Sequence, residues 1–237
     1  MSRPVPGPDT PGREADTPER EKGLKVFRSV VYATIEPVTQ WLVRRGVHPN
    51  AITIMGFLAT LAGALMFSRD HVRTAGLLVL LGGLLDIFDG RVARVSGLAS
   101  KFGSFFDSTL DRISEIAMYI GFITLYNGYI LEATDIWMIY VITLALGGSL
   151  MVSYTRARAE ALGFECTVGL MQRAERIVLL GVGSLVFGLA WGGRVLSLII
   201  IIVAVLTNIT AIHRIVWVYR HGKGVPLDGG GDAAGKA

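Results

Sequence analysis

The chain has little cysteine and little charge, and these two shortages exclude several classes of protein. Cys166 is the only cysteine among 237 residues, so an intrachain disulfide and a thiolate metal cluster are both excluded. Charged residues make up only 18% of the chain, against about 25% in ordinary soluble domains, while hydrophobic residues make up 51%. This imbalance is typical of a membrane protein. The net charge of +4 does not indicate a nucleic-acid partner, because anionic lipid headgroups explain it equally well.

The two ends of the chain lack the apolar residues of a folded segment. Prolines recur among mixed charges in residues 1–23, which also lack the apolar core of a signal peptide. We interpret residues 1–23 as a disordered cytosolic tail, because such a segment buries too little surface to offset its ordering entropy. Residues 224–237, rich in glycine and alanine, are interpreted as a second flexible tail. Residues 24–223 are then expected to form one domain.

Long hydrophobic stretches, in contrast, are abundant. A membrane-spanning helix needs about 20 mostly apolar residues to cross roughly 30 Å of hydrocarbon. The stretches that qualify, some only with flanking residues, are Ala51–Ser68, Thr74–Val92, Phe102–Tyr126, Ile136–Arg156, Ile177–Trp191 and Val195–Tyr219. Before them, Val26–Val43 mixes apolar and polar residues and predicts an interfacial amphipathic helix, with a soluble helix packed on the domain as the alternative. The sequence thus predicts an all-α integral membrane protein with six transmembrane helices preceded by an interfacial amphipathic helix.

The distribution of basic residues predicts the orientation of these helices. Most lysines and arginines fall on one side, whereas the loops of the other side hold only Arg69, Arg73 and Arg194. The positive-inside rule therefore predicts a multi-pass protein of the cell membrane with both termini in the cytosol. An even number of spans agrees with that orientation.

Four aspartates lie at the expected cytosolic ends of the second and third stretches. Asp86 and Asp89 are three residues apart, and Asp107 and Asp111 are four residues apart, so each pair shares one face of its helix. A short polar connection between adjacent helices would bring both pairs to one depth. Carboxylates near hydrocarbon are costly and repel one another. A salt-bridge network with nearby arginines would relieve the repulsion, but Mg²⁺ or Mn²⁺ with hard oxygen ligands resolves it better.

The aspartates belong to a longer pattern of fixed spacing. It reads Asp86-x2-Asp89-Gly90-x2-Ala93-Arg94-x8-Gly103-x3-Asp107-x3-Asp111. This pattern resembles the signature of the CDP-alcohol phosphotransferase family at every fixed position, and Pro49-Asn50-x2-Thr53 is similar to a further family feature. The resemblance extends to about Tyr219. It implies transfer of a phosphatidyl group from a CDP-linked lipid, usually CDP-diacylglycerol, to a small polar alcohol, with release of CMP.

The same resemblance implies roles for individual residues. The implied ligands of two divalent ions, Mg²⁺ or Mn²⁺, are Asp86, Asp89, Asp107 and Asp111. Asp111 is also implied to be the general base that activates the acceptor hydroxyl. The residues that resemble nucleotide-contacting positions are Gly90, Ala93 and Arg94, with Asn50 and Thr53 as further candidates. Two metals would clamp the diphosphate oxygens and stabilise the leaving CMP. Members of the family often form homodimers, so a homodimer is a further expectation.

A second basic cluster bears on the identity of the acceptor. The passage from Ser153 to Ile177 resembles the branch of the family that uses an inositol phosphate. The residues matching basic positions that bind the acceptor phosphate there are Arg156, Arg173, Arg176 and Arg214. Ordinary positive-inside placement explains these arginines equally well. An inositol phosphate is the expected acceptor, and glycerol phosphate, serine and unphosphorylated inositol are the rivals.

Two other classes of membrane protein also carry intramembrane aspartates. A cation-coupled transporter would distribute carboxylates through the depth of the membrane, whereas here all four are expected at one face. An aromatic prenyltransferase, also Mg²⁺-dependent, usually has more spans and a different spacing of aspartates. The spacing therefore favours the phosphotransferase.

Overall fold

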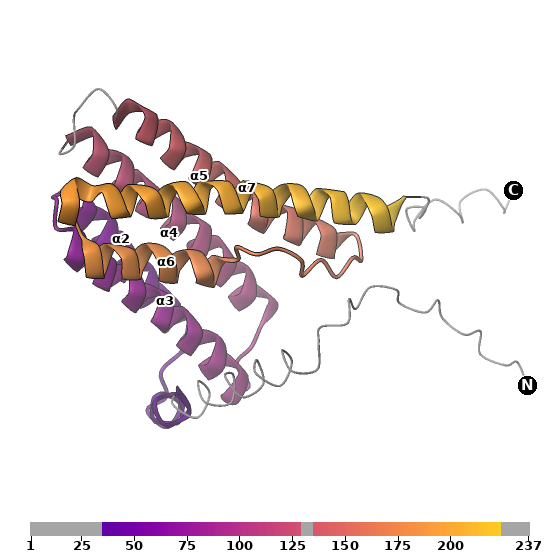
Figure 1. Ribbon diagram of the computed structural model, residues 1–237. Coiled ribbons are helices and arrows are strands. Elements are labelled where there is room, and N and C mark those ends of the chain that lie inside the picture. The colour runs from indigo at the N-terminus through magenta and orange to yellow at the C-terminus, as the bar shows by residue number, and fades with distance from the viewer. Residues whose placement is uncertain (1–34, 129–134, 224–237) are drawn as a thin grey trace, which may run out of the picture. The chain divides into compact units, whose positions relative to one another are not determined.

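The computed structural model describes residues 35–128 and 135–223, and their regular structure is entirely helical (Figure 1). The chain divides into two compact units, and the boundary lies between Val47 and His48. In the first unit, the described residues 35–44 are helical. Residues 26–34 of the expected amphipathic helix and both expected tails lie outside the described residues. The interfacial position of this helix stays a prediction.

The second unit contains the helices of the predicted membrane domain. They are α2 (Pro49–Phe67), α3 (Val72–Val95), α4 (Lys101–Gly128), α5 (Asp135–Ala161), α6 (Arg173–Phe187), η1 (Ala190–Gly193) and α7 (Arg194–Gly222). Each long α-helix overlaps one of the hydrophobic stretches. Helix α6 shows the largest displacement, because it begins at Arg173 and ends at Phe187 instead of running from Ile177 to Trp191. Gly188 has a φ of 53°, a left-handed conformation that favours glycine and ends the helix.

Within residues 35–128 and 135–223, three helical segments are long and apolar enough to cross a membrane. They are Pro49–Phe67, Ile136–Ala161 and Ala190–Gly222. Helices α3 and α4 carry the aspartates and several basic residues, which lower their hydropathy. Helix α6 has 15 residues, which span only about 22 Å at the rise of an α-helix. The structure is therefore all-helical with three candidate spans, and crossings by α3, α4 and α6 stay predictions.

Helix α2 brings α3 and α4 together, because it packs extensively on both. The approach of α2 to α3 depends on Gly82, where a Cβ atom would lie 2.2 Å from Thr60 Oγ1 and 2.9 Å from the Gly56 carbonyl oxygen. Small residues of this kind let helices approach closely in membranes. The other extensive pairs are α3 with α6, α4 with α5, α5 with α7 and α6 with α7. The two aspartate-bearing helices thus meet through a third helix.

Hydrogen bonds between side chains tie α4 to its neighbours. Tyr119 Oη lies 3.0 Å from Ser149 Oγ of α5, and Tyr126 Oη lies 2.8 Å from Ser197 Oγ of α7. Both tyrosines are fully buried, so each hydroxyl needs such a partner. These contacts hold the end of α4 that is distant from its aspartates.

Candidate active site

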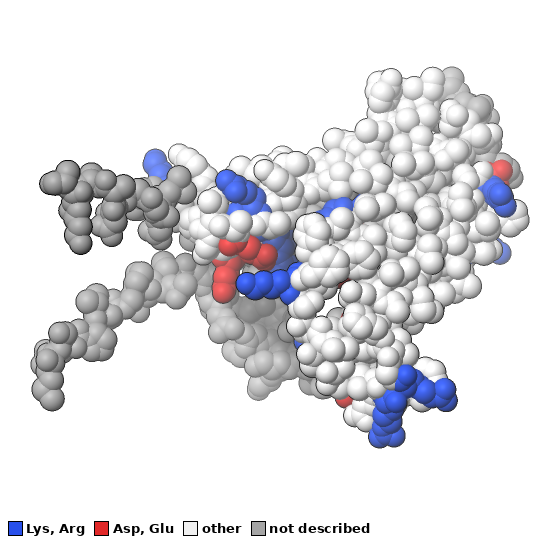
Figure 2. Space-filling view, turned by 180° about the vertical axis from the view of Figure 1, so that it is seen from behind, with Lys and Arg blue, Asp and Glu red and all other residues white. Residues whose placement is uncertain are grey.

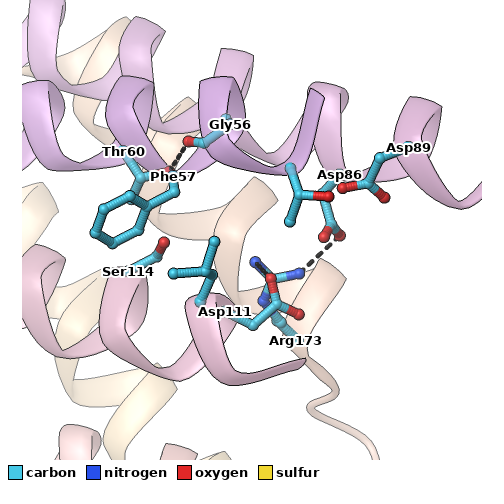
Figure 3. A pocket seen from close by; sticks show the side chains of 11 residues that line it. Gly56, Phe57, Thr60, Asp86, Asp89, Asp111, Ser114 and Arg173 are labelled. Carbon is cyan, nitrogen blue, oxygen red and sulfur yellow. Dashed lines mark hydrogen bonds and ion pairs between the residues drawn. The ribbon is translucent and has the colours of Figure 1, made fainter. Parts of the chain in front are cut away.

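Three of the four aspartates form one close group. Asp86 and Asp89 project from α3 and Asp107 from α4, and each offers a carboxylate oxygen within 4.8 Å of the other two. Asp111 lies outside this group but is connected to it by Arg173 of α6. Arg173 Nη1 lies 2.7 Å from Asp86 Oδ2, and Nη2 lies 2.5 Å from Asp111 Oδ1 (Figure 3). One guanidinium therefore bridges the two aspartate-bearing helices.

The close group fits a divalent cation. Asp89 Oδ2 and Asp107 Oδ1 are buried and have no hydrogen-bond partner. Such carboxylate oxygens are costly to bury, and a bound cation would satisfy them. Among the described residues the group contains carboxylates only, without His or Cys. An oxygen-only donor set suits a hard cation such as Mg²⁺ or Mn²⁺ and is unsuited to structural zinc.

A cavity of about 230 Å³, here called the smaller cavity, adjoins Asp89 and Asp107. The residues expected to contact a nucleotide all line it: Asn50, Thr53, Gly90, Ala93 and Arg94. Pro49 occupies the start of α2, where its missing N–H costs nothing, and His48 Nδ1 accepts a hydrogen bond from the Asn50 N–H at 3.2 Å. Because Pro49 and Asn50 line the same cavity as Asp89, the start of α2 faces the aspartate end of α3.

Glycine keeps the wall of the smaller cavity open. A Cβ atom on Gly90 would meet only Arg94 Nη2, at 3.6 Å. A Cβ atom on Gly103 would lie 3.1 Å from Ser100 Oγ and 3.6 Å from Asn50 Oδ1. A larger side chain at either position would therefore reduce the volume of the smaller cavity.

A second cavity, of about 820 Å³, is here called the larger cavity. Asp86, Asp107 and Asp111 line it, so Asp107 belongs to the walls of both cavities. Arg156 of α5, Arg173 of α6 and Arg214 of α7 contribute the basic side chains expected for an acceptor phosphate. Arg158 does not line this cavity. Figure 2 shows acidic side chains gathered in a hollow with basic side chains around it.

Arg214 is held by backbone carbonyl groups. Its Nε donates to the Val168 carbonyl at 2.8 Å and its Nη1 to the Val152 carbonyl at 2.5 Å. The residue is only 2% exposed. A cationic side chain in α7 would be costly without such partners. These bonds fix one side of the guanidinium at the wall of the larger cavity.

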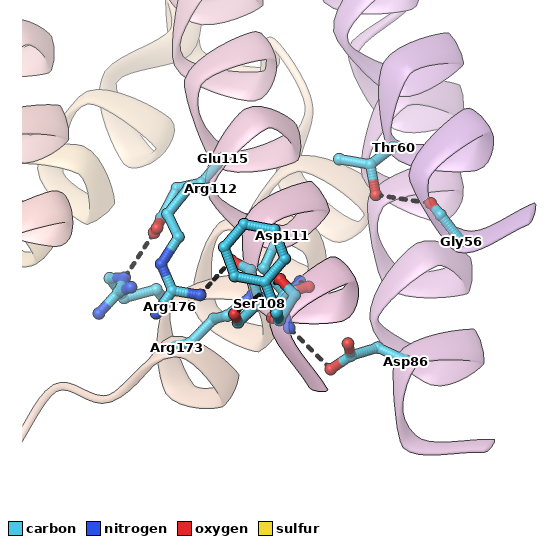
Figure 4. Close-up of polar contacts among 10 residues, drawn as sticks. Gly56, Thr60, Asp86, Ser108, Asp111, Arg112, Glu115, Arg173 and Arg176 are labelled. Carbon is cyan, nitrogen blue, oxygen red and sulfur yellow. Dashed lines mark hydrogen bonds and ion pairs between the residues drawn. The ribbon is translucent and has the colours of Figure 1, made fainter. Parts of the chain in front are cut away.

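Arg176 occupies a different environment from the other three arginines. Its side chain is fully buried, and its Nε donates to Glu115 Oε1 of α4 at 2.8 Å (Figure 4). It does not line the larger cavity. The structure thus separates Arg176 from Arg156, Arg173 and Arg214. Sequence reasoning missed Glu115, although its position four residues after Asp111 places it on the same helical face.

Comparison with known proteins identifies the family of this chain. A model of the CDP-alcohol phosphatidyltransferase family matches residues 46–209. An archaetidylinositol phosphate synthase from Methanothermobacter thermautotrophicus is 36% identical over 200 residues, which are 84% of this chain and 96% of that protein. A phosphatidylinositol phosphate synthase from Streptomyces avermitilis is 36% identical over 222 residues, 88% of each chain.

Solved structures of a related enzyme share the fold. The crystal structure of Mycobacterium tuberculosis phosphatidylinositol phosphate synthase with CDP-DAG bound matches with a TM-score of 0.68 at 31% identity, covering 77% of this chain and 92% of that one. The same enzyme in complex with manganese and citrate matches with a TM-score of 0.69, covering 77% and 88%. The family match spans most of the residues that build the aspartate group and both cavities. This chain therefore belongs to the CDP-alcohol phosphatidyltransferase family.

Proposed function

We propose that the protein transfers a phosphatidyl-type group from a CDP-linked lipid such as CDP-diacylglycerol to an inositol phosphate and releases CMP. The observation that carries the proposal is the group formed by Asp86, Asp89 and Asp107, with Asp107 lining both cavities. A transferase of this kind needs two substrates beside one charged centre. The archaetidylinositol phosphate synthase and the phosphatidylinositol phosphate synthase reported above each match more than four fifths of this chain, which supports the choice of acceptor.

The aspartate group is the proposed metal site. Asp86, Asp89 and Asp107 would hold a divalent cation, and Asp111 would complete a site for a second one. The manganese complex of the M. tuberculosis neighbour supports this assignment. A divalent cation there supplies positive charge that neutralises the diphosphate of the donor. The unpartnered oxygens of Asp89 and Asp107 are the atoms best placed to bind it.

The smaller cavity is the proposed nucleotide site. Asn50, Thr53, Gly90 and Ala93 would line the bound cytidine phosphate, and Arg94 would donate to its phosphate oxygens with the fork geometry of a guanidinium. The crystal structure of the M. tuberculosis enzyme with CDP-DAG supports a donor of this class.

Asp111 is the proposed general base. It lines the larger cavity, and Arg173 holds its Oδ1. The acceptor hydroxyl oxygen forms a bond to the phosphorus that carries the lipid, and the bond from that phosphorus to the bridging oxygen breaks. The bridging oxygen leaves with CMP, and the hydroxyl proton passes to Asp111. The protein contributes mainly position and electrostatics to this transfer.

The larger cavity is the proposed acceptor site. Its lining includes arginines from three different helices, namely Arg156, Arg173 and Arg214. Guanidinium groups bind phosphate oxygens strongly because their hydrogen bonds are charge-assisted. A phosphorylated acceptor therefore suits this cavity better than serine or unphosphorylated inositol. Arg176 is excluded from the proposed phosphate contacts because it is buried against Glu115.

The aspartate end is proposed to lie at the cytosolic face of the cell membrane. Helices α3, α4 and α6 would cross beside the three apolar segments, and both termini would be cytosolic. Shorter or more polar helices are tolerated where they pack inside a bundle. Reporter domains fused to the C-terminus test this orientation, because a cytosolic end gives fluorescence and no periplasmic phosphatase activity.

An acceptor panel tests the proposed function. Purified protein with Mg²⁺ or Mn²⁺ and CDP-diacylglycerol is supplied in turn with inositol 1-phosphate, inositol, glycerol 3-phosphate and serine, and CMP release is measured. We expect release with inositol 1-phosphate at a kcat/KM at least about tenfold above inositol and serine, which lack the phosphate and so lose a charge-assisted contact. Glycerol 3-phosphate keeps the phosphate, and we expect it to be used less well than inositol 1-phosphate because the relatives named above are synthases of inositol lipids. Preference for glycerol 3-phosphate would reject the proposed acceptor. No release with any acceptor would reject the reaction.

A further inference from the structure

Two ion pairs, one turn apart, connect α4 to α6, and each is here called a rung. Asp111 pairs with Arg173 at 2.5 Å, and Glu115 pairs with Arg176 at 2.8 Å. Asp111 and Glu115 are four residues apart on α4, while Arg173 and Arg176 are three apart on α6, so each set shares one helical face. Figure 4 shows both arginines directed from α6 toward α4. The position of one rung therefore constrains the other.

The two rungs differ in their exposure. The side chains of Arg173 and Asp111 are 25% and 17% exposed, and both line the larger cavity. The side chains of Arg176 and Glu115 are 0% and 5% exposed, and neither lines it. The first rung can exchange partners with a ligand, whereas the second is enclosed by protein.

A buried ion pair is weak evidence for a contribution to stability. Removing two charges from water costs about as much as their attraction returns, and apolar replacements of similar volume are often neutral or stabilising. Here Arg176 Nη2 also lacks a hydrogen-bond partner, which adds to the cost. A buried pair nevertheless restricts position, because each charge is tolerated in the protein interior only beside its partner.

Arg176 also fixes the segment that precedes α6. Its Nη1 donates to the Met171 carbonyl at 3.3 Å. The Met171 N–H in turn donates to Thr210 Oγ1 of α7 at 3.3 Å. The guanidinium paired with Glu115 thus connects α4, the start of α6 and α7. Arg173 begins α6 two residues after Met171, so its backbone position depends on these contacts.

We propose that Glu115 is a positioning residue, which acts through Arg176 to hold the Arg173 guanidinium between Asp86 and Asp111 at the acceptor cavity wall. This role rests on the proposed function, because Arg173 is taken to meet the phosphate of the acceptor. Glu115 itself touches neither substrate. Its loss releases the rotation of α6 and moves Arg173 relative to the two carboxylates.

The first test replaces Glu115 with glutamine, which keeps the shape of the side chain and removes its charge. Glu115→Gln raises the KM for inositol 1-phosphate about tenfold, as expected for one misplaced charge-assisted contact, and changes the KM for CDP-diacylglycerol less than about twofold. The melting shift that inositol 1-phosphate induces in the protein without donor shrinks in parallel. If Arg176 contacted the acceptor directly, freeing it would leave this KM unchanged or lower it, and the proposal would be overturned.

A paired variant separates position from stability. Glu115→Met with Arg176→Met removes both buried charges, so the protein melts at or above the wild-type temperature. The KM for inositol 1-phosphate nevertheless stays about tenfold raised, because nothing replaces the fixed position of Arg173. Restoration of the wild-type KM in this variant would show that the pair is only structural. Tyr126→Phe, which removes a buried contact at the distant end of α4, is the matched control with lowered melting temperature and unchanged KM.

Wild-type activity distinguishes failure of this proposal from failure of the proposed function. If the wild type releases no CMP with inositol 1-phosphate, the function is wrong whatever the Glu115 variants do. If the wild type is active and Glu115→Gln binds and uses the acceptor normally, only the positioning role is wrong.

Discussion

The smaller and the larger cavity differ in how their walls are distributed along the chain. The smaller cavity takes its lining from Pro49 to Asp107, on α2, α3, α4 and the connection before α4. The larger cavity takes its lining from Leu80 to Arg214, on helices from α3 to α7. A site built from residues that are near in the sequence can be recognised from their fixed spacings. A site assembled from five helices can be recognised only from the packed structure.

The cavities also differ in the number of guanidinium groups. Among the described residues, Arg94 lines the smaller cavity beside two carboxylates, whereas four arginines line the larger cavity beside five carboxylates. The formal charge of the two linings is therefore the same, and the larger cavity differs in offering more guanidinium donors, which suit the phosphate of the proposed acceptor. Changes in the shared centre should therefore affect both substrates, and changes in either wall should affect one.

Loss of a carboxylate at the shared centre should have the largest effect. Asp107→Asn removes a charge from the group with Asp86 and Asp89, and we expect kcat to fall about 10³-fold, in the range for loss of a main electrostatic contact. Titration with Mn²⁺, followed by electron paramagnetic resonance, should show weakened binding. Glu165→Gln, an exposed carboxylate outside both linings, is the control. Unchanged CMP release from Asp107→Asn would remove the metal site from the proposal.

Filling the smaller cavity should raise the KM for the donor and leave the KM for the acceptor nearly unchanged. Gly90→Leu adds a side chain where only Arg94 lies within 4 Å, so the protein should fold and the new side chain should occupy the nucleotide space. We expect the KM for CDP-diacylglycerol to rise roughly 10- to 100-fold, because steric exclusion removes several contacts together. The KM for inositol 1-phosphate should stay within about twofold. Equal effects on both substrates would contradict separate cavities.

Removal of one arginine from the larger cavity should raise the KM for the acceptor and leave the KM for the donor unchanged. Arg156→Ala should raise the KM for inositol 1-phosphate about tenfold, the loss expected for one charge-assisted bond, with the donor KM unchanged. Arg158→Ala is the matched control, because Arg158 is exposed, two residues further along α5 and absent from the cavity wall. If the two variants behave alike, Arg156 is surface charge and takes no part in acceptor binding.

The smallest effect is expected far from both cavities. Tyr126→Phe removes the hydroxyl that lies 2.8 Å from Ser197 Oγ, and thermal unfolding in detergent should show a loss of about 0.5–1 kcal/mol, typical of hydrogen bonds between membrane helices. Both KM values should remain those of the wild type. A change in either KM would mean that the distant end of α4 is coupled to the aspartates.

Sequence patterns predicted the helices well and their membrane role less completely. Each of the six hydrophobic stretches overlaps an α-helix, because long apolar runs in this chain have few other solutions. Helix α6 was predicted too close to the C-terminus, because its first turn, which begins at Arg173, is polar and a hydropathy pattern does not include it. Crossing by α3, α4 and α6 and the expected homodimer stay predictions.

The acceptor arginines show where sequence reasoning stopped. Arg173 and Arg176, three residues apart, were both expected to bind the acceptor phosphate. The structure instead pairs Arg173 with Asp86 and Asp111 and pairs Arg176 with Glu115. A three-residue spacing fixes the face of a helix but not the depth at which each side chain ends. Depth depends on the neighbouring helix, and α4 offers a different carboxylate at each turn.

The sequence by itself determined the helical fold, the family and the residues of the aspartate group, because these depend on composition and on spacings within a few turns. Only the tertiary structure decided which carboxylates lie close enough together to hold a cation, which arginines line the larger cavity and which ion pair is buried. Contacts such as Arg173 with Asp86 join residues far apart in the chain. Their geometry follows from the packing of α2, α3, α4 and α6, which no local pattern encodes.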